Sequence, residues 1–205
     1  MINTFTTEKI ISEVKKLLYL YSLKQTIRYG QSRDKNDYTE SVADHVYGMH
    51  LISDYFLPLE DPDYKMNKTR IQELITWHDI VEVETGDIPR VRKTQKDNDY
   101  ELIAIKEVVQ KAPDSLKLII KELTTEYETQ TTPESRFVKA IDKIEPLIHC
   151  YHPLGKFTQQ NLKLTVESSR EVKEKYIANF PYIKLFSDTL HKVMESEGYF
   201  YKNKI

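Results

Sequence analysis

A histidine interrupts the apolar stripe of one expected helix, and an aspartate follows it directly. In the segment IQELITWHDIVEVETGDIP, residues 71–89, apolar side chains recur at Ile71 and Leu74, and the next position on that face is His78. Asp79 comes immediately after it. Polar and charged groups inside a protein destabilise it unless they have partners. The segment therefore predicts that these two side chains share a polar partner in the interior.

Two other expected helices carry the same anomaly. His45 lies three residues after Val42, and Asp142 lies four residues after Val138, so both point toward the apolar face of their helix. The four polar side chains are His45, His78, Asp79 and Asp142. They supply two nitrogen and two oxygen ligands, a set that suits a divalent ion such as zinc, manganese, iron, cobalt or nickel. One bound cation would account for all three interruptions.

The alternative is that these residues are ordinary. A lone histidine on an apolar face is more often a hydrogen-bonded core residue than a ligand, and adjacent His-Asp pairs are common by chance. The coincidence on three helices favours a metal site. The order along the chain, first His, then His-Asp, then a distant Asp, favours it further.

This pattern resembles the HD-domain metal-dependent phosphohydrolases, in particular the branch of 5′-deoxynucleotidases. The resemblance covers roughly residues 10–150 and is carried by ESVADH, WHDIVEVETGDIP and KAIDKIE. A bare H…HD…D match would be weak, but this extended context is more specific. The resemblance implies an all-α fold, the HD-domain helical bundle. It also implies one divalent metal ion (Mn, Co, Zn, Fe, Ni or Mg) held by His45, His78, Asp79 and Asp142.

Glu82 is the candidate catalytic residue. It lies four residues after His78, which in a continuous helix places it one turn beyond the ligands on the same side. A divalent ion lowers the pKa of a water that it binds from about 16 to about 7, and a nearby carboxylate can exchange protons with that water or with the leaving group. The alternative is a surface residue in an acidic helix, since Glu84 follows. The resemblance places a catalytic glutamate here.

Arg28 and Asp87 are candidates for substrate binding. A guanidinium can meet two phosphate oxygens at once, so Arg28 is a candidate phosphate clamp. Its alternative role is to complement the dipole at the end of the first helix. Asp87, in the turn TGDIP, would lie at the rim of the pocket, where it either accepts loop amides or, by the resemblance, contacts the sugar hydroxyl of a nucleotide.

Two features depart from the resembling branch and bear on substrate preference. The branch often carries a tryptophan after the arginine, where this chain has Tyr29, and the loop QSRDKNDYTE before His45 is longer than usual. Tyr29 is a candidate for stacking on a base, but it is one of 14 tyrosines. Base and sugar preference are therefore left open.

Composition excludes several other classes. Lys and Arg total 30 against 32 Asp and Glu, which gives no support for a nucleic-acid or membrane partner. The patch RVRK, residues 90–93, is short and is more typical of a solvated loop, although Lys93 could help to hold phosphate. No signal peptide or membrane span is evident. The single cysteine, Cys150, agrees with a reducing compartment, so we expect a cytoplasmic protein; the motif HCYH around it lacks the ligands of a structural zinc site.

Only five glycines in 205 residues favour helices over a sheet. We expect one domain over residues 1–205, with a core of about 10–150 and C-terminal helices over 151–205. The apolar stripes and helix stops predict helices at 10–21, 42–56, from 71 to the stop at Gly86, 97–111, 114–127, 134–150, 158–177 and 182–197.

The expected function is removal of phosphate from (deoxy)nucleoside 5′-monophosphates by attack of metal-activated water. The partner is a small-molecule nucleotide, and the resemblance implies a homodimer. No histidine occurs between His78 and His149, which argues against the two-metal phosphodiesterases of the superfamily. The alternatives are an HD hydrolase of another nucleotide, either guanosine tetraphosphate or a nucleotide diester, and a non-catalytic nucleotide-binding HD protein.

Overall fold

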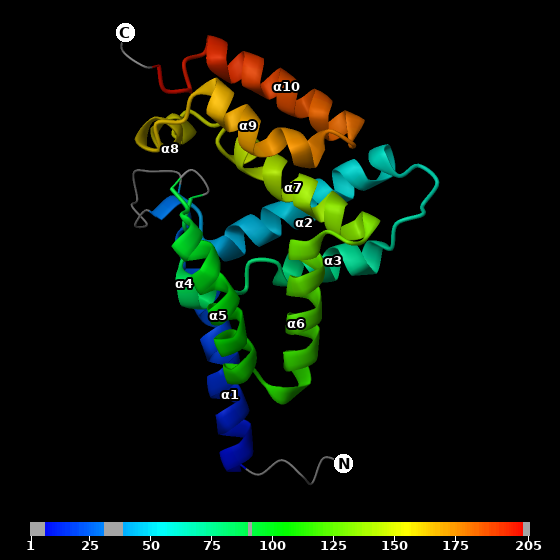
Figure 1. The fold of residues 1–205 in the computed structure, drawn as a ribbon, viewed down its shortest axis with the longest axis vertical. Coiled ribbons are helices and arrows are strands. Elements are labelled where there is room, and N and C mark those ends of the chain that lie inside the picture. The colour runs from blue at the N-terminus through cyan, green and yellow to red at the C-terminus, as the bar shows by residue number, and fades with distance from the viewer. Residues whose placement is uncertain (1–6, 31–38, 90–91, 203–205) are drawn as a thin grey trace.

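The described part of the protein is built from a succession of helices (Figure 1). The structure is a computed structural model and describes residues 7–30, 39–89 and 92–202. The α-helices of these residues are α1 (Thr7–Tyr21), α2 (Val42–Glu60), α3 (Lys68–Trp77), α4 (Glu82–Thr85), α5 (Gln95–Lys111), α6 (Asp114–Thr129), α7 (Pro133–His149), α8 (Gly155–Asn161), α9 (Val166–Ile177) and α10 (Pro181–Ser196). Two 3₁₀ turns, η2 (Ser22–Gln25) and η3 (Arg28–Gly30), follow α1. The extended pairing in this part of the chain is an isolated antiparallel bridge between Ile27 and Ser41, so the predicted all-α class is confirmed.

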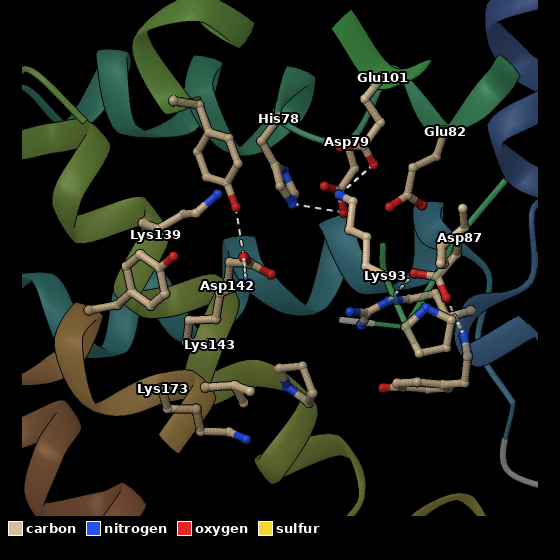
Figure 2. Close-up of a pocket in the computed structure, with 18 of the residues that line it drawn as sticks. His78, Asp79, Glu82, Asp87, Lys93, Glu101, Lys139, Asp142, Lys143 and Lys173 are labelled. Carbon is tan, nitrogen blue, oxygen red and sulfur yellow. Dashed lines mark hydrogen bonds and ion pairs between the residues drawn. The ribbon is translucent and has the colours of Figure 1, made fainter. Parts of the chain in front are cut away.

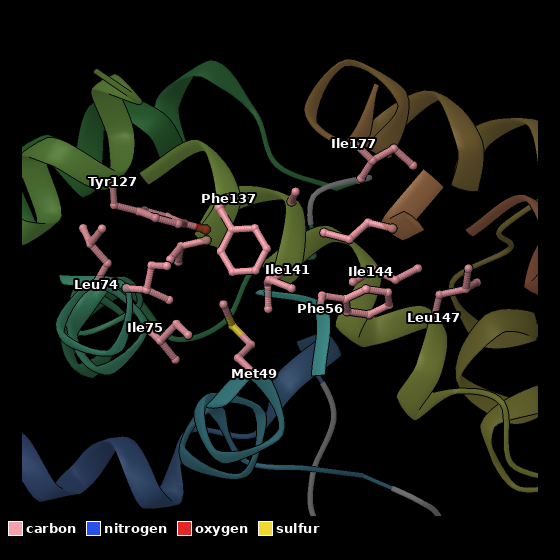
Figure 3. Close-up of a cluster of buried hydrophobic side chains, with 14 of the residues drawn as sticks. Met49, Phe56, Leu74, Ile75, Tyr127, Phe137, Ile141, Ile144, Leu147 and Ile177 are labelled. Carbon is pink, nitrogen blue, oxygen red and sulfur yellow. The ribbon is translucent and has the colours of Figure 1, made fainter. Parts of the chain in front are cut away.

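Helix α7 lies at the centre of the fold and packs against α2, α3, α9 and α10 (Figure 1). Met49 of α2, Leu74 of α3 and Ile141 of α7 meet in the main apolar core, and all three are fully buried (Figure 3). Burying a large aliphatic side chain contributes about 1.5–3 kcal/mol. This core therefore holds α2, α3 and α7 in a fixed relation. Among the described helices, none is both long and apolar enough to cross a membrane.

Local capping fixes the start of α2 just before His45. Ser41 Oγ accepts a hydrogen bond from the Asp44 amide at 3.2 Å, and the Asp44 carboxylate accepts one from the Ser41 amide at 2.8 Å. This reciprocal capping box satisfies two amides that have no partner inside the helix. Because the helix starts at Val42, His45 lies in its first turns and points into the interior, with no exposed surface.

The prediction of one continuous helix from residue 71 to Gly86 is wrong. The helix α3 ends at Trp77. Hydrogen bonds that span three residues then lead into α4, from the Ile80 amide to the Trp77 carbonyl (3.2 Å) and from the Glu82 amide to the Asp79 carbonyl (3.0 Å). His78 Nδ1 bonds to the Ile75 carbonyl at 2.8 Å. In a continuing helix that carbonyl would accept from the Asp79 amide. The imidazole competes for it, and the chain turns at the predicted ligands.

An apolar anchor holds this turn in place. Ile80 is 4% exposed and packs in a second apolar core with Val108 of α5 and Ile120 of α6. Its neighbours His78 and Asp79 face the other way, into the pocket described below. Within one short turn, Ile80 therefore packs into the core while His78 and Asp79 line the pocket.

Two further expectations are corrected. The helix predicted over 158–177 is two helices, because Lys163 has a left-handed φ of 52° between α8 and α9, and Thr165 caps α9. Arg28 does not sit at the end of the first helix. It lies in η3, well beyond Tyr21 where α1 ends, so it cannot complement the α1 dipole.

A buried histidine in α10 predicts acid sensitivity of the fold. His191 is fully buried, its Nδ1 bonds to the Ser187 carbonyl at 2.7 Å, and its Nε2 bonds to Ser169 Oγ at 3.0 Å. Burial lowers the pKa of His191 to about 4, whereas in the unfolded chain it titrates near 6.5.

Since the unfolded state takes up the proton first as pH falls, the free energy of unfolding is unaffected by His191 above pH 6.5 and decreases between pH 6.5 and 4. The expected loss is on the order of 2 kcal/mol between pH 7.5 and 5.0. Chemical denaturation of the wild type and of His191→Gln at both pH values measures it. The variant should lose less stability over this range, and equal losses in the two proteins would contradict the assignment.

Candidate metal centre and active site

The four predicted ligands come together from three parts of the fold. His45 belongs to α2, His78 and Asp79 to the turn after α3, and Asp142 to α7. His45 Nε2 lies 3.4 Å from Asp142 Oδ1 and 3.9 Å from Asp79 Oδ2, and His78 Nε2 lies 3.0 Å from Asp79 Oδ2. Figure 2 shows His78, Asp79 and Asp142 directed toward the same space. Suitable ligand atoms of His45, His78 and Asp79 all lie within 4.8 Å of one another.

The donor atoms fit a divalent cation. The Nε2 atoms of His45 and His78 are buried and have no hydrogen-bond partner among the described residues. His78 Nδ1 donates its proton to a carbonyl, so a neutral His78 would turn the lone pair of Nε2 toward the Asp79 carboxylate. Two such acceptors repel each other unless a positive charge lies between them. Imidazole and carboxylate ligands together suit zinc, manganese, iron, cobalt or nickel.

The electrostatics of His45 lead to the same requirement for positive charge. Burial and the nearby Arg28 lower the pKa of His45, but Glu145 and Asp142 outweigh them and raise it to about 9. The carboxylates around this imidazole thus favour a cation at its position. A proton supplies that charge in the metal-free protein, and a metal ion would displace the proton from Nε2.

Three of the predicted ligands, His45, His78 and Asp142, are also held from outside the centre. His45 Nδ1 bonds to Glu145 Oε2 at 2.6 Å. Asp142 Oδ2 accepts hydrogen bonds from Tyr127 Oη and Lys143 Nζ, both at 2.7 Å, which leaves Oδ1 directed at His45. Outer partners of this kind fix the orientation of metal ligands.

A cavity of about 390 Å³ opens beside these residues (Figure 2). Figure 2 shows Asp79, Glu82 and Asp87 on one side of the cavity. Lys139, Lys143 and Lys173, from α7 and α9, lie on the other side, which we call the basic wall. The C-terminal part of the chain therefore helps to build the pocket.

Lys173 is a buried cation in the basic wall. It is 8% exposed, and its Nζ donates to the Ser169 carbonyl at 2.9 Å and to Ser169 Oγ at 3.0 Å. Burial and the neighbouring Lys143 lower the pKa of Lys173 to about 8. An anionic or carbonyl group of a ligand would be a favourable partner for this amine.

Glu82 lies in the pocket, where a proton-transfer group is needed. The continuous helix from which this position was predicted is interrupted between Trp77 and Glu82. Glu82 begins α4, lines the same pocket as His78 and Asp79, and its Oε2 is buried without a hydrogen-bond partner in the described part of the chain. Burial, with Asp79 and Asp87, raises the pKa of Glu82 well above its usual value. A carboxyl group with a raised pKa can take up and release a proton closer to neutral pH. Glu84 instead points away, to Lys111 at 2.5 Å.

Arg28 lines the pocket but is largely engaged by carboxylates. Its Nη1 donates to Glu40 Oε1 at 2.6 Å and lies 3.3 Å from Glu145 Oε2, while its Nε is buried without a hydrogen-bond partner, 4.0 Å from Asp87 Oδ1. Asp87 Oδ2 accepts the backbone amide of Tyr29, so its expected role toward loop amides is present.

Tyr29 lies at the edge of the same pocket, with 9% of its surface exposed and its hydroxyl donating to Glu40 at 3.1 Å. The longer loop that precedes His45 falls largely on residues 31–38, outside the described residues. Arg90 and Val91 of the RVRK patch also lie outside them, whereas Lys93 lines the pocket and pairs with Glu101 at 2.5 Å. The motif HCYH contributes to neither of the metal-compatible groups found in the described residues.

The residues that orient the predicted ligands were not identified from the sequence. Glu145 carried a usable signal, because it lies seven residues after Val138 on the apolar face of α7. No sequence pattern marked Tyr127 as a partner of Asp142, since it fits the apolar stripe of α6 like any buried aromatic residue. Lys143 follows Asp142 directly, and no periodicity marks it as a partner.

Comparison with known proteins agrees with this helical fold. The family model of the HD domain matches residues 20–184, and the chain belongs to the HD domain family.

Its relatives include the 5′-deoxynucleotidase hdd1 of Schizosaccharomyces pombe, 35% identical over 155 residues, with 73% of this chain and 76% of that protein covered. The 5′-deoxynucleotidase HDDC2 of Homo sapiens is 31% identical over 147 residues, covering 71% of this chain and 70% of the relative. The match to HDDC2 of Xenopus laevis, 34% identical, spans 62% of this chain and 61% of that protein.

A solved structure shares the fold over nearly the whole chain. It is the predicted metal-dependent phosphohydrolase from Magnetospirillum magnetotacticum MS-1, with a TM-score of 0.77 and 19% identity, covering 94% of this chain and 98% of the other. The C-terminal helices α8 to α10 are thus part of a fold that other proteins also have.

Proposed function

We propose that the protein is a metal-dependent phosphohydrolase that removes phosphate from nucleoside 5′-monophosphates, with deoxynucleotides preferred. The observation that carries the proposal is the convergence of His45, His78, Asp79 and Asp142 beside a pocket that also contains Glu82. Relatives that are about one-third identical bear the name 5′-deoxynucleotidase, which supports the choice of substrate.

One divalent ion would be held by His45, His78, Asp79 and Asp142. When bound, it supplies a water of lowered pKa and a positive charge for the phosphoryl oxygens. The second metal-compatible group in the described residues is Glu40, His45 and Glu145. There the guanidinium of Arg28 already provides the positive charge, so we propose a single metal ion.

The protein's own side chains would transfer protons and bind the phosphate and the sugar. Glu82, with its free Oε2 in the pocket, takes the proton from the attacking water or returns one to the leaving group. Arg28 offers its Nε, which makes no hydrogen bond within the described residues, to a phosphoryl oxygen. Asp87, fixed by the Tyr29 amide, accepts a hydroxyl of the sugar, and the amines of Lys143 and Lys173 face the substrate from the basic wall.

A phosphate-release screen tests the proposal. Deoxynucleoside and ribonucleoside 5′-monophosphates, diphosphates and cyclic nucleotides are each supplied with one divalent ion at a time. We expect release from deoxynucleoside 5′-monophosphates that depends on the metal and stops on adding a chelator. Preference for a cyclic diester or a pyrophosphate would select another HD hydrolase activity. Nucleotide binding without any release would select the non-catalytic alternative.

A further inference from the structure

Glu145 touches both a predicted metal ligand and the predicted phosphate-binding arginine. It is on α7, one turn after Asp142, and is 5% exposed. Its Oε2 lies 2.6 Å from His45 Nδ1 and 3.3 Å from Arg28 Nη1. A buried carboxylate is stable only with such partners, so these two contacts define where the Glu145 side chain sits.

The contact with His45 determines which nitrogen is available to a metal. A hydrogen bond from Nδ1 to a carboxylate keeps the proton on Nδ1 and leaves Nε2 to act as the ligand. Nε2 is the atom that faces Asp142 and Asp79. The equivalent contact of His78 is to the backbone carbonyl of Ile75, which no substitution removes. Of the two imidazoles, His45 is therefore the one whose orientation rests on a replaceable side chain.

Gly48 supplies independent evidence that α2 is shaped around this carboxylate. It lies one turn after His45 in the middle of the helix, where glycine destabilises by about 0.5–1 kcal/mol relative to alanine. A Cβ at this position would lie 2.9 Å from Glu145 Oε1 and 3.6 Å from its Cδ. The nearer distance is shorter than van der Waals contact allows. Any larger residue would push the Glu145 carboxylate away from its present position.

Arg28 and Glu40 explain why Glu145 remains outside the metal centre. The Arg28 guanidinium lies between the two carboxylates, 2.6 Å from Glu40 and 3.3 Å from Glu145. Glu145 therefore has its compensating charge in Arg28. It can hold His45 without itself competing for the cation.

We propose that Glu145 is the positioning residue that holds His45 for metal binding, and that Gly48 provides the space this arrangement requires. The inference rests on the proposed metal centre but not on which phosphate ester is hydrolysed.

Metal titration of Glu145→Gln and Gly48→Ala tests the proposal. The metal-free proteins are titrated with Zn²⁺ in competition with a chromophoric chelator, and the absorption spectrum of the Co²⁺-loaded proteins is recorded. Glu145→Gln should weaken metal affinity by about 10–100-fold and alter the Co²⁺ spectrum. Glu134→Gln, in the same helix but bonded to the Asn67 amide outside the site, is the matched control and should leave both unchanged.

Gly48→Ala separates positioning from a general effect on stability. Alanine favours the helix, so a merely structural role predicts equal or higher stability with unchanged metal affinity. Our proposal predicts weaker affinity in a folded protein. It also predicts that the double variant resembles Glu145→Gln alone, since both changes act on one contact.

Unchanged affinity and spectrum in Glu145→Gln overturn the proposal. If that variant does not fold, unchanged affinity in Gly48→Ala overturns it instead. Because these measurements need no turnover, a wild type that binds metal but releases no phosphate would refute the proposed function and leave this inference standing.

Discussion

Glu82→Gln should lower turnover by about 10²–10⁴-fold while the protein still binds its metal. Glutamine keeps the size of the side chain but cannot take a proton from water or give one to the leaving group. Glu82 makes no hydrogen bond with Oε2 among the described residues, so its loss should leave the fold intact. Steady-state phosphate release and metal content, measured on the same preparation, show the two effects separately.

Glu84→Gln is the matched control, because it makes the same replacement in the same short helix. The Glu84 carboxylate pairs with Lys111 outside the pocket and should contribute little to catalysis. We expect near wild-type turnover from this variant. Full activity in Glu82→Gln, or an equal loss in both variants, would show that Glu82 does not carry the proton.

His78→Ala and Asp79→Ala should lose metal, activity and metal-dependent stability together. Ligand binding to the folded state stabilises it by about 2.7 kcal/mol when the free ligand is at 100 times its Kd. Wild-type protein should therefore unfold at a higher temperature with a divalent ion than with a chelator. In either variant the metal should produce little increase in Tm, because site formation is coupled to folding.

His50→Gln controls for the removal of an imidazole near the site. His50 lies on α2 like His45, but its Nδ1 contacts Gln72, and it is absent from the pocket walls. This variant should keep both the metal and the increase in Tm. Stoichiometric metal in His78→Ala, with the wild-type increase in Tm, would mean that the ion binds elsewhere.

The sequence predicted most of the helices, and the four side chains that it suggested as metal ligands lie close together in the structure. Apolar periodicity was sufficient for α2, α6, α7 and α10, because the burial of each stripe dominates its local structure. His45 and Asp142 could be singled out for the same reason, since a polar side chain on such a stripe is conspicuous. The family pattern, now confirmed, added the order in which the residues occur.

Periodicity failed where side chains compete with the backbone. The segment from His78 to Glu82 has helical spacing, yet the bond from His78 to the Ile75 carbonyl ends the helix. The position of Glu82 was predicted for a reason that the structure does not support. It reaches the pocket because Ile80 anchors the turn, an effect that requires α5 and α6 to be placed first.

Contacts between residues that are distant along the chain could not be predicted from the sequence either. Arg28 had two expected roles, at a helix end or on phosphate, and its pairing with Glu40 and Glu145 was not among them. Such a network depends on the relative placement of η3, α2 and α7. That placement follows from the packing of the whole core rather than from any local pattern.

The proposed metal centre is tested most directly by diffraction from crystals grown with one divalent transition metal, recorded on both sides of its absorption edge. We expect one strong anomalous peak per chain, within coordinating distance of His45 Nε2, His78 Nε2 and the carboxylates of Asp79 and Asp142. A peak bound by other residues, or no peak in crystals whose protein binds and hydrolyses the nucleotide, would contradict it.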